Sequence, residues 1–399
     1  MRPLNAILPV ALAASLLLAC SSSGAKPDAA GGDDAAGATD ALAPGDAPDG
    51  SDARVIVTEV AALPGCGAAH LALSAAKIFW TDRAAGVVRS LSLSSPGAIP
   101  DTLATGQMSP GAITRDDVAI FWANEGDHTI MRAPFEGAAP APLLTAPAAV
   151  TALLANAGTL YYAAGPGTYE VPTVGGASTT LMTFATCRTS RPGALALDVD
   201  HVYQTDFNQQ LLTRGRLDGT QMVNDPCAAD PTTAPKIAAP ETITHTQGEL
   251  LIGAVAVSSG QVIWADGSGL YAKPVTGGTQ NTQTLAQSAG GFPITGFVVS
   301  GSNIYFGETG DPATDLDADT IEVVPLVPGD AGASSPTIIA QGQRGASQFV
   351  ADDANIYWVT KTPPVVVPVD GSACTTDELQ TCCGAVCLPN DCAIMQLAK

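Results

Sequence analysis

A short aliphatic–aromatic motif recurs seven times in this chain of 399 residues. In each copy, one or two aromatic side chains follow an aliphatic residue; the copies begin at Ile78, Ile120, Leu160, Val202, Val262, Ile304 and Ile356. Four of the six intervals are 40 or 42 residues, and the other two are 60 and 52. Such a period indicates one supersecondary unit, repeated so that neighbouring copies bury each other's faces.

Each unit contains signals for four short strands. An apolar triplet such as Leu71–Leu73 precedes the motif and predicts an inner strand buried on both faces. Runs with proline before glycine, as in Lys273–Gly278 and Val367–Gly371, predict a third strand, and Leu103–Thr105 is typical of the fourth. Four strands and their turns need about 40 to 45 residues. We therefore predict an all-β fold, a seven-bladed β-propeller with four-stranded antiparallel blades, over residues 54–399.

One strand signal stands apart from the seven units. Arg54–Val60 precedes the first inner strand and has no unit of its own. We expect it to be the fourth strand of the last blade, which would close the ring without a free sheet edge.

The first residues have the pattern of an export signal. Residues 1–19 hold one cation, Arg2, and an apolar stretch. Leu17–Cys20 resembles the lipobox of bacterial lipoproteins, which implies lipidation of Cys20 with palmitate-type chains and a stable membrane anchor. Ser21, in place of Asp, favours sorting to the outer membrane under the rule for that class. The alternative is an ordinary cleaved secretory signal.

Residues 20–53 are almost entirely Ser, Gly, Ala, Pro and Asp, which predicts a disordered tether. The net charge of −21 argues against nucleic acid and anionic lipid surfaces as partners. We expect a monomer in the cell envelope whose partner is an envelope protein, a glycan or a small ligand.

Ile78–Asp82 resembles the repeat of YWTD-type β-propellers, which occur in lipoprotein-receptor ectodomains. Only the first copy keeps the Trp-Thr-Asp run, and this chain has seven copies where that family has six. The chain is also similar to bacterial propeller lipoproteins of unassigned role. The resemblance implies ligand binding without locating a site.

Eight cysteines follow Cys20, and an even number in an exported chain predicts disulfides. They are Cys66, Cys187, Cys227, Cys374, Cys382, Cys383, Cys387 and Cys392. Five lie within 374–392, so one of them needs a partner elsewhere, for which we favour Cys66; Cys187 and Cys227 would then pair. A zinc site in the cluster is the alternative.

Two residues beyond the motif, five copies carry an acid or an amide. These residues are Asp82, Asn124, Asp206, Asp266 and Glu308. Equivalent blades would place them in an incomplete ring on one face, a possible rim for a cation or a polar ligand. The alternative is that each side chain accepts backbone amides in its own turn.

A second acidic group lies in the long loop of the sixth copy. Asp315, Asp317 and Asp319 alternate with other residues, which suits calcium. The loop departs from an EF-hand because Thr320 stands where glycine is needed. The alternative is a solvated acidic loop without a cofactor.

Catalysis has little support in the sequence. The seven inner triplets contain no ionisable side chain, and no nucleophile elbow, zinc-protease or phosphate-loop motif occurs. The four histidines are scattered; His128, near Glu125 and Asp127, is the best candidate. We therefore predict a binding or scaffold module that uses its loop-bearing face, with insertions at about 220–247 and 308–320. A hydrolase or lyase on that face is the alternative, and a purely structural envelope component is a third hypothesis.

Overall fold

The structure is a computed structural model. It describes residues 57–63, 70–135, 139–184, 190–220, 222–224, 236–238, 241–245, 254–267, 269–276, 282–288, 293–310, 319–326, 333–361, 366–368, 385–387 and 392–399. The chain divides into two units, residues 1–53 and residues 54–399, each with most of its contacts within itself. The predicted signal peptide, Cys20 and the predicted tether lie outside the described residues.

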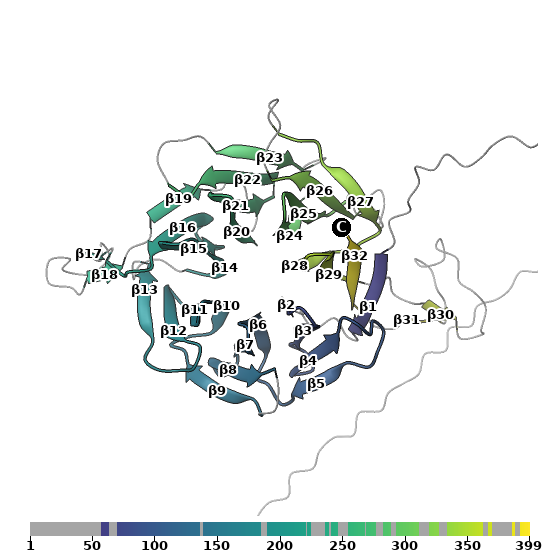
Figure 1. Ribbon diagram of the computed structural model, residues 1–399, viewed down its shortest axis with the longest axis horizontal. Coiled ribbons are helices and arrows are strands. Elements are labelled where there is room, and N and C mark those ends of the chain that lie inside the picture. The colour runs from purple at the N-terminus through teal and green to yellow at the C-terminus, as the bar shows by residue number, and fades with distance from the viewer. Residues whose placement is uncertain are drawn as a thin grey trace, which may run out of the picture. The chain divides into compact units, whose positions relative to one another are not determined.

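Seven four-stranded antiparallel sheets follow one another around a ring, with the first strand of each near the centre (Figure 1). Blade 1 comprises β2 (Leu71–Leu73), β3 (Lys77–Asp82), β4 (Val87–Ser92) and β5 (Asp101–Ala104). Blade 2 comprises β6 (Pro110–Arg115), β7 (Ala119–Asn124), β8 (Thr129–Pro134) and β9 (Ala141–Thr145). Blade 3 comprises β10 (Val150–Asn156), β11 (Thr159–Ala164), β12 (Gly167–Pro172) and β13 (Thr179–Thr183). The predicted fold class is confirmed.

The later blades follow the same order with insertions. Blade 4 comprises β14 (Pro192–Leu197), β15 (His201–Asp206), β16 (Leu211–Arg216) and β19 (Glu241–His245). Blade 5 comprises β20 (Val255–Ser258), β21 (Gln261–Asp266), β22 (Gly269–Pro274) and β23 (Gln283–Gln287). Blade 6 comprises β24 (Ile294–Ser300), β25 (Asn303–Glu308), β26 (Thr320–Pro325) and β27 (Thr337–Gln341). Blade 7 comprises β28 (Ser347–Ala351), β29 (Asn355–Lys361), β32 (Cys392–Ala398) and β1 (Val57–Leu63).

Two short ribbons interrupt this pattern. β17 (Met222–Asn224) pairs with β18 (Lys236–Ala238) between β16 and β19. β30 (Val366–Pro368) pairs with β31 (Ala385–Cys387) between β29 and β32. Among the described residues, no helix has the length and apolar character that a membrane span requires.

The ring closes through the N-terminal strand, as predicted. β1 pairs with β32 from Val57 opposite Leu397 to Leu63 opposite Cys392, and Figure 1 shows the two strands side by side. This pairing covers the edge that β32 would otherwise expose to another chain.

The predicted position of the third strand in the last blade is wrong. The sequence placed it at Val367–Gly371, but Val366–Pro368 belongs to a ribbon and β32 takes that position. β32 buries Ala393, and it packs Ile394 against blade 1 and Leu397 against blade 6, a contribution to two interfaces that a three-residue run cannot make. The cysteine-rich segment is therefore a connection inside blade 7.

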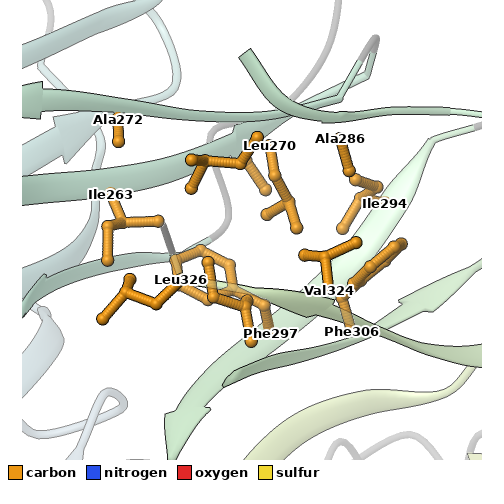
Figure 2. Packing of buried hydrophobic residues seen from close by; sticks show 12 residues of the cluster. Ile263, Leu270, Ala272, Ala286, Ile294, Phe297, Phe306, Val324 and Leu326 are labelled. Carbon is orange, nitrogen blue, oxygen red and sulfur yellow. The ribbon is translucent and has the colours of Figure 1, made fainter. Parts of the chain in front are cut away.

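The core consists of seven apolar clusters, one between each pair of neighbouring blades. Figure 2 shows the cluster between blades 5 and 6, where Leu270 and Ala286 face Phe306 and Val324. Each motif serves two interfaces, because successive side chains of a strand point to opposite faces. Ile120 and Trp122 pack against blade 1, whereas Phe121 packs against blade 3.

Candidate functional site

A pocket of about 550 Å³ opens where the inner strands begin. We call this side of the ring the pocket face; it carries the connections between the second and third strands of the blades. All seven blades contribute residues to the lining. The volume lies within the range of about 300 to 1,000 Å³ that is common for small-molecule sites.

β-Bulges supply one set of lining residues. The register of the inner strand shifts at Thr151, Gly193, Thr295 and Gln348, and all four line the pocket. A bulge re-aims a side chain and is common beside functional sites. Gln348 also has a φ of 57°, a left-handed backbone that costs a non-glycine residue about 1 kcal/mol or more. These residues were not predicted from the sequence, in which the only signal was a small or polar residue just before an apolar triplet.

The second set follows the motif strands. Arg83, Glu125, Phe207 and Gly267 line the pocket, and each comes directly after one of the predicted rim residues. The rim residues themselves are buried. Since neighbouring residues of a strand point in opposite directions, the chain position after the predicted rim is the one that reaches the pocket.

Arg83 and Glu125 form an ion pair that joins blades 1 and 2 across the pocket wall. The carboxylate lies so close to the backbone of Gly111 that a β-carbon there would overlap it. Arg83 also lies near His70, whose pKa falls to about 4 because burial and, secondarily, this guanidinium disfavour its charged form. His70 is therefore neutral at pH 7.

Arg191 lies over the ring of Phe207, with its Cζ 5.5 Å from the ring centroid. The amide of Phe207 donates a hydrogen bond to the carbonyl oxygen of Arg191 at 2.9 Å. Gly193 allows the ring to approach, since a β-carbon there would lie 2.6 Å from Phe207 Cε2. The hydroxyl of Thr151 is buried in the same pocket without a hydrogen-bond partner among the described residues.

The predicted rim residues make local hydrogen bonds. Asp82 accepts the amide of Ala85 and Asp206 accepts that of Gln209, both at 2.9 Å, as the structural alternative requires. Asp206 also accepts the hydroxyl of Ser190, and Glu308 accepts that of Ser288 at 2.9 Å.

Asn124 differs because its amide nitrogen donates to Gln107 Oε1 and Thr129 Oγ1, both at 3.1 Å. Asp266 is buried at the equivalent position of blade 5. Ligand binding by this rim stays a prediction.

Of the three residues predicted to bind calcium, the structure describes only Asp319. Asp315 and Asp317 lie outside the described residues, while Asp319 accepts the amides of Gly310 at 2.8 Å and Gly345 at 2.6 Å. Among the described residues, no group of three or more metal-ligating side chains gathers. Calcium binding at Asp315, Asp317 and Asp319 stays a prediction.

Most of the cysteines also lie outside the part of the chain that the structure describes. Cys66, Cys187, Cys227, Cys374, Cys382 and Cys383 lie outside the described residues, as does the side chain of Cys387. Cys392 is buried and disulfide-bonded. The proposed connectivity stays a prediction.

The other mouth of the channel combines the apolar inner triplets with charged residues such as Arg115 and Asp116. Two pockets of about 580 and 350 Å³ share Leu154, Ala155 and Asn156 there. The predicted inner triplets Leu71–Leu73, Leu195–Leu197 and Val255–Val257 line them, as expected.

The two long insertions do not share a face. β25 ends and β26 begins at the pocket face, whereas β16 ends and β19 begins at the opposite face, because strands alternate in direction. His128, the preferred histidine, lies in the connection between β7 and β8 with a φ of 60°. It does not line the pocket, although its neighbour Glu125 does.

No family model matches the sequence, and no curated protein matches it at a significant level. Solved structures do resemble it. A streptogramin B lyase has a TM-score of 0.59 at 11% identity, over 86% of this chain and 97% of the lyase. Virginiamycin B lyase from Staphylococcus aureus has a TM-score of 0.55 at 10% identity, over 86% and 99% of the two chains.

A catalytically inactive form of that enzyme with quinupristin gives 0.54 at 9% identity, over the same shares of the two chains. At these identities the likeness shows the fold alone. It fits the β-propeller fold that the repeat predicted.

Proposed function

We propose that this chain is a lipid-anchored envelope protein whose propeller binds a small polar ligand in the central pocket of the pocket face. The convergence of all seven blades on one pocket carries this proposal. Bulges and a left-handed backbone at Gln348 support it, because such strain is retained mostly where function needs it. The export signal and the lipobox resemblance support the anchor.

A binding screen of the purified full chain tests the pocket. Isothermal titration calorimetry would cover neutral sugars, sugar acids, amino-acid derivatives and short glycans. Thr151→Phe, which places a large ring in the pocket, should abolish binding of any hit. Asn156→Phe is the matched control, since Asn156 is exposed at the other end of the same strand, β10.

Binding that survives Thr151→Phe but is lost in Asn156→Phe would assign the ligand to the opposite mouth of the channel instead. A screen without a hit in the wild-type chain would contradict the proposal.

A hydrolase or lyase that uses the same pocket is the rival proposal. The ionisable side chains that line it, among the described residues, are His70, Arg83, Glu125 and Arg191. Glu125 is the one carboxylate of this set, and it is held in an ion pair with Arg83. Turnover of a bound compound that is lost in Glu125→Gln would support the enzyme.

A further inference from the structure

Arg191 is exposed to solvent at the pocket wall, and the ring of Phe207 orients its side chain. Its guanidinium is held over Phe207, and that ring is in turn held against the backbone of Gly193. The main-chain hydrogen bond between Phe207 and Arg191 ties the two residues together. Less side-chain entropy is therefore lost when a ligand binds to this guanidinium than to a freely rotating arginine.

No carboxylate of the described residues forms an ion pair with Arg191. Arg83 and Arg216, by contrast, pair with Glu125 and Asp218. Asp206, near Arg191 in the fold, is fully buried and accepts hydrogen bonds from its own turn and from Ser190. In a chain with 38 acidic and 17 basic residues, an arginine in a pocket without an acid partner is available to a ligand anion.

The charge of the whole chain favours a ligand with a single negative charge. The net charge of −21 opposes the approach of any anion, and it opposes a dianion about twice as strongly. A carboxylate carries one charge at neutral pH, whereas phosphate carries between one and two. Thr151 and Gln348 line the same pocket and supply a hydroxyl and an amide for uncharged parts of the ligand.

We propose that the pocket ligand is a small carboxylate and that the guanidinium of Arg191 binds it through two parallel hydrogen bonds. The planar fork of arginine matches the two oxygens of a carboxylate, and such charge-assisted bonds are among the strongest in proteins. This inference rests on the proposed function, because it names the chemistry of the ligand in that pocket. A sugar acid and a peptide-type carboxylate both satisfy it.

Calorimetry of the full chain at pH 7.5 and low salt tests the inference. The probes are glucuronate and N-acetylalanine, their neutral counterparts glucose and N-acetylalanine amide, and inorganic phosphate. We expect at least one carboxylate to bind, and its neutral counterpart to bind at least about tenfold more weakly. The carboxylate that binds identifies the source.

Variants then locate the carboxylate. Arg191→Gln should raise Kd about tenfold or more, and Arg191→Lys should retain part of the affinity because it keeps the charge without the fork. Arg216→Gln is the control. Arg216 is an exposed arginine of β16 that pairs with Asp218, so this variant should bind like the wild type. Thermal melting of each variant checks that the fold is unchanged.

Three results would overturn the inference: no binding by either carboxylate, equal binding of the neutral counterparts, or tighter binding of phosphate. Unchanged affinity in Arg191→Gln would do the same. If an uncharged compound binds and Thr151→Phe blocks its binding, the proposed binding function of the pocket stands, and the inference that its ligand is a carboxylate is wrong. If no compound of any class binds, both proposals fail.

Discussion

A repeated glutamine holds the indole groups of two blades. Trp122 Nε1 donates to Gln107 Oε1 at 2.9 Å, and Trp358 Nε1 donates to Gln343 Oε1 at 3.1 Å. Each glutamine follows a left-handed glycine, with a φ of 65° at Gly106 and 71° at Gly342. Both glutamines also donate to the carbonyl oxygen two residues earlier, at 3.0 Å. The connection between blades thus satisfies the buried polar atom of the next motif.

Gln107→Leu should destabilise the protein. The substitution leaves the buried indole N–H of Trp122 without its partner, which costs about 1 to 3 kcal/mol. Urea unfolding followed by tryptophan fluorescence measures the change in the free energy of unfolding. Gln283→Leu, at an exposed position at the start of β23, is the control. Equal midpoints for the two variants would contradict this role for Gln107.

The stability should depend on pH through His70. Its folded-state pKa of about 4 lies below its ordinary value of 6.5, so the unfolded chain binds the proton more tightly. This contribution is complete above pH 6.5 and is lost as the pH falls towards 4, by about 3 kcal/mol. His70→Gln should remove that dependence in urea unfolding at pH 4.5 and pH 7. Parallel pH profiles of variant and wild type would refute it.

At the scale of the strand, the motif works because its three positions alternate between interfaces. In blade 1, Ile78 and Trp80 join the cluster with blade 7, and Phe79 joins the cluster with blade 2. Blade 4 replaces the third position by Gln204, which is fully buried and accepts a hydrogen bond from Thr168 of blade 3. A polar pair therefore takes the place of an apolar contact at this interface.

Removal of β1 should open the ring. Deletion of residues 57–63 removes Val60 and Leu63 from the closing cluster and exposes the edge of β32. The expected loss is about 5 kcal/mol or more, with self-association through the exposed edge. Thermal unfolding and analytical ultracentrifugation measure both effects. Deletion of residues 31–48, within the predicted tether, is the control, and an equal effect of the two deletions would contradict closure by β1.

At the scale of the whole molecule, the ring has two mouths that differ in the strand ends that form them. The pocket face gathers polar or charged side chains from six of the seven blades, and blade 5 contributes Gly267. At the opposite mouth, the apolar inner triplets lie beside the charged residues of Arg115–Asp117. The bulges at the starts of the inner strands bring Thr151, Thr295 and Gln348 into the lining of the pocket face. The two mouths therefore differ in these bulges rather than by a simple division into polar and apolar.

The proposed anchor can be tested on the same whole chain. Cys20→Ser should move the protein from the membrane fraction to the soluble fraction, because several acyl chains provide the attachment. Ser21→Asp should leave the protein anchored but change the membrane to which it is sorted. Cell fractionation and mass spectrometry of the N-terminal peptide provide the readouts. A Cys20→Ser protein that stays with the membrane would contradict lipidation.

Much of the fold could be predicted from the sequence because the repeat is local. The alternation of Ile78, Phe79 and Trp80, the turns that flank them and the number of copies all lie within short windows. Asp82 and Asp206 were placed at the ends of the motif strands, but the pocket begins one residue later, at Arg83 and Phe207. Which of two neighbouring residues faces the channel depends on the twist of the sheet around the ring.

Sequence alone determined the unit, the number of blades and the strand that closes the ring, since each depends on hydrophobic periodicity along the chain. Tertiary structure decided that β32 completes blade 7 and that the bulge residues line the pocket. It also decided that Arg191 lies over Phe207 without an acid partner among the described residues. Strand pairing between distant segments and the register of each pair set these features, and neither leaves a periodic signal in the residues themselves.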